Sequence, residues 1–321
     1  MTLLKRLIYA AILLTAVLVL NFSMMHFAPG DVADTIAASM GGADAETMAQ
    51  IRVEYGLDQP FFVQLFAYIG RVLSFDLGYS YFYNTPVTEL IFERLPATLL
   101  LAITAQVLAV VVGVLLGVFS ARHPNGIANY FVTIFALFGY AAPVFWTGIL
   151  LLIGFSLKIP LFPVAGMSDV TVQGGFFVKA LDIAHHMVLP VLTLSSIFLA
   201  LYSRLSRAAM LEVLGSDYIR TAKAKGLSNR EVTLKHALKN ALPPVVTLAG
   251  LQFSAVISGA VLVESVFSWP GLGQLALTSI LARDTPTILG ILFFSALVVI
   301  IGNLVTDLVM RLIDPRVRGH A

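Results

Sequence analysis

The sequence of 321 residues contains no cysteine and few charged side chains. The absence of cysteine excludes disulfides and thiolate metal sites, although it does not identify a cellular compartment. Only 12% of the residues are Asp, Glu, Lys or Arg, against roughly 25% in soluble domains, and 58% are hydrophobic. Together with a mean hydropathy of +0.90, this composition indicates a polytopic membrane protein.

Motifs that mark catalytic chains are also missing. No G-x-x-x-x-G-K-[ST] segment is present, so the chain has no phosphate-binding loop of its own. Neither H-E-x-x-H nor G-x-S-x-G occurs. The sequence therefore predicts a non-catalytic chain without a metal or cofactor site, and any coupled ATP hydrolysis has to take place on another polypeptide.

Six apolar runs are long enough to cross a bilayer, for which about 20 residues are needed. They cover roughly residues 7–28, 97–120, 130–156, 187–206, 243–263 and 286–310. The first run is too long for a signal-peptide core and lacks a small-x-small cleavage site, so we expect it to be retained. The predicted fold class is all-α, with six transmembrane helices.

The basic residues are distributed unevenly among the segments between these spans. When both termini are assigned to the cytoplasm, fourteen Lys and Arg lie inside and six lie outside. The positive-inside rule therefore predicts cytoplasmic termini. The long outer segment is expected to be ordered, with helices over residues 44–55, 60–74 and 86–94.

A basic, helix-forming segment separates the fourth and fifth spans on the predicted cytoplasmic side. Ser216 can cap a short helix whose first turn carries Asp217, and Gly226 stands where a left-handed residue would end it. Ser228 and Glu231 have the spacing of a capping box that opens a second helix.

Two adjacent prolines, Pro243 and Pro244, are expected to stop this second helix and to begin the next span. The succession of helix, glycine break, helix and proline predicts a small projection that docks against a soluble cytoplasmic partner. A protein that only conducts a solute does not need such a segment.

The segment D-Y-I-R-T-A-K-A-K-G-L-S, followed by H-A-L-K-N-A-L-P, resembles the EAA loop of ABC importer permeases. Arg220 and Thr221 replace the Glu-Ala of the broader pattern, and the Gly-to-Pro spacing is longer than in sugar importers. Both departures are similar to the dipeptide, oligopeptide and nickel subgroup. In that family the short helix couples to a groove of the ATPase subunit. The resemblance implies this coupling role for Asp217, Tyr218, Ile219, Arg220, Thr221, Ala222, Lys223, Ala224, Lys225 and Gly226.

Further motifs resemble the B-type subunits of the same subgroup in order and spacing, from about residue 5 to 318. They are Pro29-Gly30-Asp31, Tyr55-Gly56-Leu57-Asp58, Asp76-Leu77-Gly78, Glu93-Arg94-Leu95-Pro96-Ala97-Thr98, the run from Glu264 to Gly273, and Asp314-Pro315-Arg316. The resemblance implies a type I, MetI-like importer fold in the bacterial cytoplasmic (inner) membrane.

The expected organisation has four parts. Residues 1–28 hold the N-terminal tail and first span, and residues 29–95 form an extracytoplasmic helical region. Residues 96–312 form the core permease domain, with a cytoplasmic coupling loop at 207–242. Residues 313–321 form a cytoplasmic tail.

The resemblance also implies partners and a function. The partners are a second homologous permease of the C type, two ABC ATPase subunits that bind ATP and Mg, an extracytoplasmic substrate-binding protein and membrane lipid, without nucleic acid. The implied function is ATP-driven import of dipeptides, oligopeptides or similar small solutes. The resemblance does not decide whether the substrate is a dipeptide, an oligopeptide, a nickel chelate, glutathione or an antimicrobial peptide. It also does not decide whether the two ATPases are identical.

Several polar side chains fall within or beside the spans, where they need partners inside the bundle. Gln106, Gln252, Ser254 and Ser258 either join helices or line a translocation path. Glu264, at the outer end of the fifth span, either forms a structural turn or contributes to an outer gate.

Two other protein classes would leave different signs in the sequence. A secondary transporter or channel acting alone favours inverted repeats and charges at mid-membrane, but no clear repeat is present and such charges are almost absent. An intramembrane enzyme needs a nucleophile–base pair or paired acids at span depth, and none is found. The adjacent His185 and His186 point about 100° apart on a helix, which suits separate hydrogen bonds better than metal binding.

Overall fold

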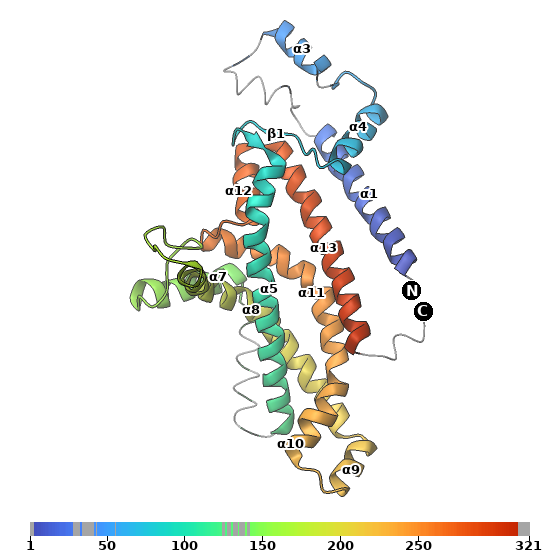
Figure 1. Cartoon of the computed structure of the whole chain (residues 1–321), viewed down its shortest axis with the longest axis vertical. Helices are drawn as coiled ribbons and strands as arrows, with labels where there is room; N and C mark the ends of the chain where they lie inside the picture. The colour runs from blue at the N-terminus through green and yellow to red at the C-terminus, as the bar shows by residue number, and fades with distance from the viewer. Residues whose placement is uncertain are drawn as a thin grey trace. The chain divides into compact units, whose positions relative to one another are not determined.

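The computed structural model describes residues 3–27, 33, 42, 44–54, 56–123, 126, 130, 134, 139 and 142–313. The described chain is mostly helical (Figure 1). In chain order its elements are α1 (Leu3–Phe27), α3 (Ala45–Glu54), α4 (Phe61–Leu73), β1 (Tyr79–Ser80), β2 (Thr85–Pro86), α5 (Val87–Arg122), α7 (Val144–Leu152), η1 (Ile153–Lys158), α8 (Phe176–Leu214), α9 (Asp217–Ala224), α10 (Asn229–Glu231), η2 (Val232–Ala237), α11 (Leu238–Val266), α12 (Leu272–Ala282) and α13 (Thr285–Ile313).

Some predictions lie outside the described residues. These are the Pro29-Gly30-Asp31 motif, Tyr55, residues 131–133, 135–138, 140 and 141 of the third span, and the Asp314-Pro315-Arg316 motif. The described part of the third span forms the apolar helix Val144–Lys158.

Five described helical segments are long and apolar enough to cross a membrane. They are Ile8–Phe27, Val87–Arg122, Phe176–Leu214, Asn229–Val266 and Thr285–Thr306. They contain the predicted second, fourth and fifth spans and most of the first and sixth, so the all-α polytopic fold is confirmed.

The helices extend beyond the predicted spans. Helix α5 begins at Val87, so the outer helix expected over 86–94 is the first part of the same helix. Pro96 lies inside α5 and Pro190 lies inside α8. A proline already has a helical φ and removes one backbone hydrogen bond, so a helix stabilised by its other bonds continues through it.

The prediction that Pro243 and Pro244 separate two helices is wrong. Segments α10, η2 and α11 follow one another without a break, and both prolines lie inside α11. Their neighbours Ala241 and Val245 are buried. Burial of this stretch in the core favours a continuous helix over the break that proline alone would favour.

The chain divides into two compact units. The first comprises residues 1–96 with 274–300, and the second comprises 97–273 with 301–321. In the second unit, α11 packs against α7 and α8. Helices α5 and α8 approach closely at Gly117, where a Cβ would lie 2.6 Å from Ser206 Cβ and 2.7 Å from the Ser203 carbonyl oxygen. Small residues at such a crossing let two helices pack in a membrane.

The first unit contains the predicted outer helices. Asp44 Oδ1 accepts the Thr47 N–H at 2.8 Å at the start of α3, and Gly56 follows it with a φ of +64°. The prediction of helices over 44–55 and 60–74 is confirmed by α3 and α4. The antiparallel hairpin of β1 and β2 was not predicted, because two-residue strands carry no alternating pattern. Ser80 anchors the hairpin by donating to Asp284 Oδ2 at 2.6 Å.

Candidate functional site

Helix α9 is the predicted short helix between α8 and α11. Its first turn carries Asp217, whose charge is favourable at the N-terminal end of the helix dipole. Ser216 occupies the N-cap position, but its hydroxyl donates to the Val213 carbonyl at 2.5 Å and does not cap α9. The predicted cap is wrong because the Ser216 hydroxyl turns back to the end of α8, where the Val213 carbonyl also accepts the Ser216 N–H at 3.1 Å.

The C-terminal end of α9 is closed by a left-handed glycine. Gly226 has a φ of +82°, which confirms the prediction. The Gly226 N–H donates to the Lys223 carbonyl at 3.0 Å, and the Leu227 N–H donates to the Ala222 carbonyl at 3.4 Å. This pair of bonds is a Schellman motif, which fixes the direction in which the chain leaves the helix.

One face of α9 is buried. Ile219 is fully buried and Ala222 is 8% exposed, and both belong to the same core cluster as Val232 and Ala237 of η2. The other eight predicted coupling residues are exposed: Asp217, Tyr218, Arg220, Thr221, Lys223, Ala224, Lys225 and Gly226. The helix is therefore attached through two apolar side chains and offers most of its surface to a partner.

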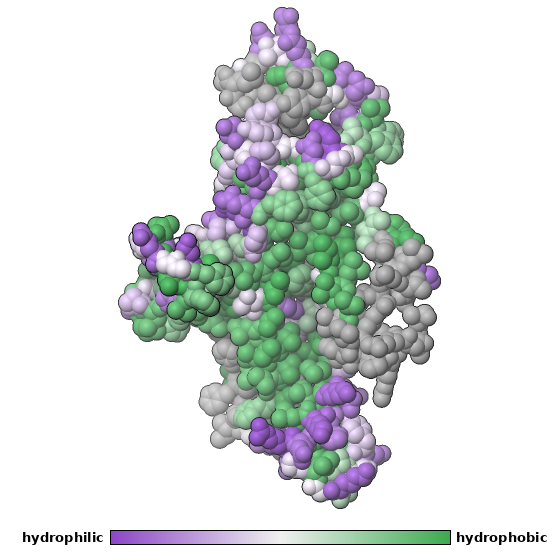
Figure 2. Space-filling model, viewed as in Figure 1, coloured by the Kyte–Doolittle hydropathy of each residue, from purple (hydrophilic) through white to green (hydrophobic). Residues whose placement is uncertain are grey.

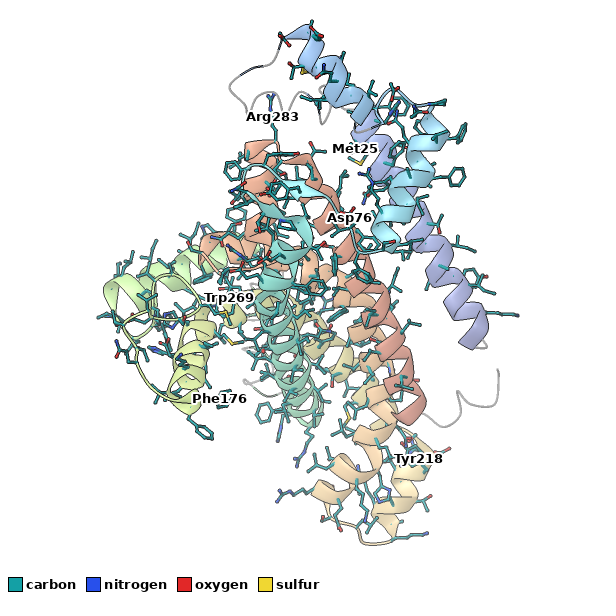
Figure 3. All side chains as sticks on the ribbon, turned by 45° about the horizontal axis from the view of Figure 1, so that its top comes forward. Met25, Asp76, Phe176, Tyr218, Trp269 and Arg283 are labelled. Atoms are coloured by element: carbon teal, nitrogen blue, oxygen red, sulfur yellow. The ribbon has the colours of Figure 1, made fainter. Side chains whose placement is uncertain are left out.

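A polar contact also ties α9 to α11. Asn240 Nδ2 donates to the Tyr218 hydroxyl oxygen at 2.8 Å and to the His236 carbonyl at 3.2 Å. The Tyr218 side chain (Figure 3) is 44% exposed, so it also reaches the outer face of α9. Sequence reasoning missed Asn240, because nothing in the chain indicates that this amide meets a phenol 22 residues earlier.

The second helix begins with the predicted capping box. Ser228 Oγ accepts the Glu231 N–H at 3.2 Å, and the Ser228 N–H donates to Glu231 Oε2 at 3.4 Å. The π-helix η2 follows directly and packs against α9. Wide helical turns of this kind are often found at functional sites.

Charged side chains cover the α9–α10 region. Figure 2 shows hydrophilic residues gathered over these two helices. Arg220 lies 3.3 Å from Asp217, but the two side chains are 77% and 96% exposed, so the pair contributes little to stability. Lys223, Lys225 and Arg230 are exposed as well. This arrangement fits electrostatic docking to a partner surface.

Gln106 joins three helices of the second unit. Its Nε2 donates at 2.9 Å to the Tyr202 hydroxyl oxygen of α8 and at 2.9 Å to the Ala249 carbonyl of α11. Its Oε1 is buried and has no hydrogen-bond partner among the residues that the structure describes. The amide therefore acts at least as a link between helices. Its place on a translocation path stays a prediction.

The serine and glutamine residues predicted on the fifth span all lie on α11. Gln252 and Ser254 are half-buried, and Ser258 is exposed. Ser254 and Ser258 are one helical turn apart and share a face. Their role on a path also stays a prediction.

Glu264 lies in the last turn of α11 and is fully buried. Its Oε1 accepts the Thr98 hydroxyl at 2.7 Å, and its Oε2 accepts the Gly273 N–H at 2.6 Å. The Thr98 hydroxyl oxygen in turn accepts the Leu272 N–H at 2.7 Å. We call Glu264, Thr98 and residues 267–273 the carboxylate clamp, because these bonds fix the loop after α11 to α5.

Two further features complete the carboxylate clamp. Trp269, labelled in Figure 3, is fully buried, and its Nε1 donates to the Ala97 carbonyl at 2.9 Å. A Cβ at Gly271 would overlap the Glu264 carboxylate, and a Cβ at Gly273 would overlap the Val261 backbone. The sequence singled out this loop and the Glu93–Thr98 motif separately but gave no sign that Thr98 meets Glu264. The gate role of Glu264 stays a prediction.

The two histidines make separate contacts. His185 Nε2 lies 2.8 Å from the Leu161 carbonyl, and His186 Nδ1 lies 3.2 Å from Asp182 Oδ1. Among the residues that the structure describes, no group of three or more His, Asp and Glu could hold a metal ion.

The sequence matches two related protein families over most of its length. Residues 113–319 match the "Binding-protein-dependent transport system inner membrane component" family. Residues 1–102 match the family described as "Binding-prot-dependent transport system membrane comp, N-term".

Two relatives that match most of the chain are named as permease proteins of peptide transport systems. The oligopeptide transport system permease protein AppB of Bacillus subtilis (strain 168) is 37% identical over 315 residues, which cover 98% of each chain. The dipeptide transport system permease protein DppB of Escherichia coli (strain K12) is 39% identical over 316 residues, which cover 93% of each chain.

Solved structures share the fold. Two inward-facing structures of the MetNI methionine ABC transporter align with TM-scores of 0.53 and 0.54, at 17% and 16% identity. Each alignment covers 70% of this chain and 96% of the other. The chain belongs to the inner membrane component family of binding-protein-dependent transport systems, and it is a permease subunit of an ABC importer.

Proposed function

We propose that this permease is the B-type membrane subunit of a peptide importer, and that residues 217–226 couple it to a separate ATPase subunit. The observation that carries the proposal is the construction of α9. The helix is closed at its C-terminal end by Gly226, attached through Ile219 and Ala222, and exposed on its remaining surface. Such a projection can receive force without being deformed by it.

The attachment of α9 also gives the force a route. Ile219 and Ala222 share a core cluster with η2, and Tyr218 accepts a hydrogen bond from Asn240 on α11. A displacement of α9 therefore acts directly on the base of α11. On this proposal, closure of two ATPase domains on ATP and Mg moves α9, and α11 moves with it to change access to the path.

The proposed assembly has four further components. They are a homologous permease of the C type, two ABC ATPase subunits and an extracytoplasmic substrate-binding protein. ATP and Mg bind to the ATPases, because this chain has no phosphate-binding loop. Both termini are cytoplasmic, which the excess of Lys and Arg on that side supports.

The proposed substrates are dipeptides or oligopeptides, because the relatives AppB and DppB are named for these solutes. Neutral amides and hydroxyls suit a cargo whose side chains vary while its backbone does not. Gln106, Gln252, Ser254 and Ser258 are the proposed path residues, and Glu264 is proposed to position the outer gate.

Site-directed cross-linking tests the coupling role, and the absence of native cysteine makes it direct. Ala224→Cys places a thiol on the exposed surface of α9. A photoreactive maleimide attached there is expected to cross-link the ATPase subunit in the assembled complex. The matched control is Ser74→Cys, exposed in the proposed extracytoplasmic region, which should give no such product. A complex that co-purifies with its ATPases but cross-links equally from both positions, or from neither, would contradict the coupling role.

Uptake into proteoliposomes tests the substrate separately. The complex, supplied with its binding protein, is expected to transport a labelled dipeptide or pentapeptide across the membrane. Transport should require ATP on the side of the membrane that carries the ATPase subunits. Cross-linking of Ala224→Cys to the ATPase subunit, without uptake of either peptide, would retain the coupling role and reject the peptide assignment.

A further inference from the structure

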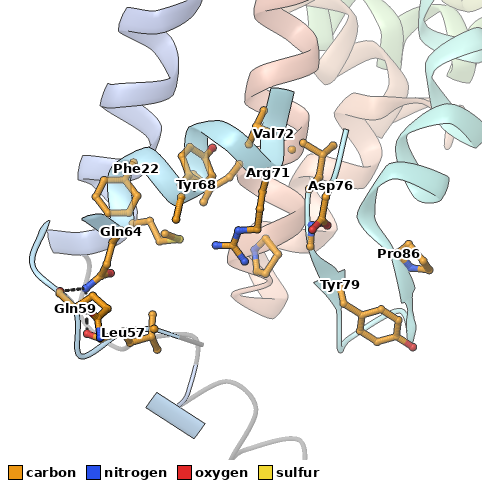
Figure 4. A pocket seen from close by; sticks show the side chains of 18 of the residues that line it. Phe22, Leu57, Gln59, Gln64, Tyr68, Arg71, Val72, Asp76, Tyr79 and Pro86 are labelled. Atoms are coloured by element: carbon orange, nitrogen blue, oxygen red, sulfur yellow. Dashed lines mark hydrogen bonds between the residues drawn. The ribbon is translucent and has the colours of Figure 1, made fainter. Parts of the chain in front are cut away.

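A cavity of about 540 Å³ lies within the first unit. Figure 4 shows it between α1, α4 and the segment that leads into the hairpin. Its walls are largely apolar and aromatic, and they include Phe22 and Met25 of α1, Tyr68 of α4 and Leu289 of α13. A cavity of this size, with few polar groups on apolar walls, is typical of a small-molecule site.

Arg71 supplies the positive charge of this cavity. In Figure 4 its guanidinium extends among the lining residues. Across the part of the chain that the structure describes, no carboxylate lies within ion-pair distance of it. Asp76 also lines the cavity, but its Oδ1 accepts the Gly78 N–H at 3.1 Å. The guanidinium therefore keeps its donors available for an external anion.

Tyr68 offers a second donor beside Arg71. The side chain is 8% exposed and lines the same cavity. Burial raises the pKa of the Tyr68 phenol, and the charge of Arg71 opposes that rise without cancelling it. The phenol is therefore protonated at neutral pH and retains its hydrogen.

The cavity lies at the ends of two membrane-crossing helices. Phe22 and Met25 belong to the last two turns of the span Ile8–Phe27, and Pro286 and Leu289 belong to the first two turns of the span Thr285–Thr306. At this depth the hydrocarbon core meets the phospholipid headgroups. Arginine and tyrosine are both suited to this interface, because each combines an apolar body with a polar tip.

We propose that this cavity binds a membrane phospholipid. Arg71 pairs with the headgroup phosphate, and an acyl chain packs against Phe22, Met25 and Leu289. The charge and position of the cavity favour this ligand, because a phosphate diester with an apolar chain satisfies the unpaired guanidinium and the apolar walls together. In the orientation proposed above the lipid comes from the outer leaflet, although the binding itself does not depend on that orientation.

Native mass spectrometry of the detergent-solubilised complex tests this proposal. Wild type is expected to retain a phospholipid, and Arg71→Gln is expected to lower its occupancy at least fivefold. Arg283→Gln is the matched control, because Arg283 is exposed in the same unit but does not line the cavity. Ala67→Phe, at a small exposed lining residue, should displace the lipid by filling the space without touching the charge.

Three results would overturn the lipid assignment. One is equal retention by wild type, Arg71→Gln and Ala67→Phe, in variants that still co-purify with their partners. Another is that inorganic phosphate alone protects wild type against thermal unfolding as well as phospholipid does, which would indicate an anion site. The third is loss of peptide uptake in Arg71→Gln with unchanged lipid, which would assign Arg71 to the substrate. Loss of lipid from Arg71→Gln, with lipid retained in Arg283→Gln, would support the proposal whether or not this complex transports peptides.

Discussion

The turn between α9 and α10 and the carboxylate clamp after α11 both combine glycine with a carboxylate, yet their bonds span very different lengths of chain. In the turn, Ser228 and Glu231 are three residues apart, and the Leu227 N–H reaches Ala222 five residues earlier. In the clamp, Thr98 donates to Glu264 across 166 residues, and Trp269 donates to Ala97 across 172. The turn can form as soon as its own residues adopt helical geometry, whereas the clamp forms only after α5 and α11 have packed.

This contrast matches the roles proposed for the two regions. A docking element has to keep its shape while it is pushed, and local bonds provide that with little dependence on the rest of the fold. A loop at the end of a moving helix has to follow the packing of its neighbours, and long-range bonds make it do so. The contrast predicts that substitutions in the carboxylate clamp affect the whole second unit, whereas those in the turn act locally.

The largest effect is expected in the carboxylate clamp. Gly271→Ala places a methyl group into the Glu264 carboxylate and should destabilise the protein by about 1–3 kcal/mol through overpacking. Glu264→Ala leaves the Thr98 hydroxyl and the Gly273 N–H without their acceptor and should cost roughly 1–3 kcal/mol per unsatisfied group. Thermal unfolding of the purified complex measures both.

The double variant sharpens this test. In the Glu264→Ala background the carboxylate is gone, so Gly271→Ala should cost at least ~1 kcal/mol less than in wild type. Gly273→Ala is the control. Its methyl group would lie 2.4 Å from Val261 Cα as well as 2.8 Å from Glu264 Oε2, so loss of the carboxylate should relieve only the smaller part of its cost. If Gly271→Ala lowered stability equally in both backgrounds, the Glu264 carboxylate would not be the group that excludes a side chain at position 271.

A smaller and local effect is expected at the end of α9. Gly226→Val puts a β-branched side chain at a φ of +82°, which costs about 1–2 kcal/mol or more for the left-handed conformation. We expect normal assembly in the membrane but a loss of coupling, measured as ATP hydrolysis no longer matched by peptide uptake.

Gly215→Ala is the matched control for this variant. It lies in the same link between α8 and α9, has a φ of −80°, and offers ordinary contact distances to a Cβ. Uptake and ATPase stimulation at wild-type levels in Gly226→Val would contradict the docking role of the turn.

The smallest effect compares two serines that look alike in sequence. Ser228 caps its helix, so Ser228→Ala should lower stability by about 1 kcal/mol. Ser216 makes no cap bond to α9, so Ser216→Ala should leave the N-terminus of α9 unaffected and lose only the bond to Val213. Hydrogen exchange of the α10 and α9 amides distinguishes them. Equal loss of protection at both helix starts would show that Ser216 does cap α9.

Much of the fold followed from sequence patterns because those patterns act locally. The long apolar runs predicted the membrane helices, Asp44 and Gly56 marked the ends of α3, and Ser228 with Glu231 marked the start of α10. The predictions failed where packing overrode a local preference. Pro243 and Pro244 lie inside α11, because burial of their neighbours favours continuity over the break that proline prefers.

The features of the candidate site likewise fall into those that a local sequence pattern predicts and those that depend on packing. Residues 217–226 could be identified from a continuous motif, whereas the contacts of Asn240 and Thr98 and the cavity around Arg71 could not. Each of these depends on side chains that lie far apart in the sequence, and no periodic pattern links them.

The sequence by itself determined the membrane class, most of the spans, the basic side and the helix–turn–helix of the coupling segment. All of these depend on composition or on interactions within a few residues. Only the tertiary structure decided how Glu264 is held, how α9 is joined to α11, and where Arg71 meets an apolar cavity. These features arise when helices pack, because only packing brings distant donors and acceptors to hydrogen-bond distance and removes them from water.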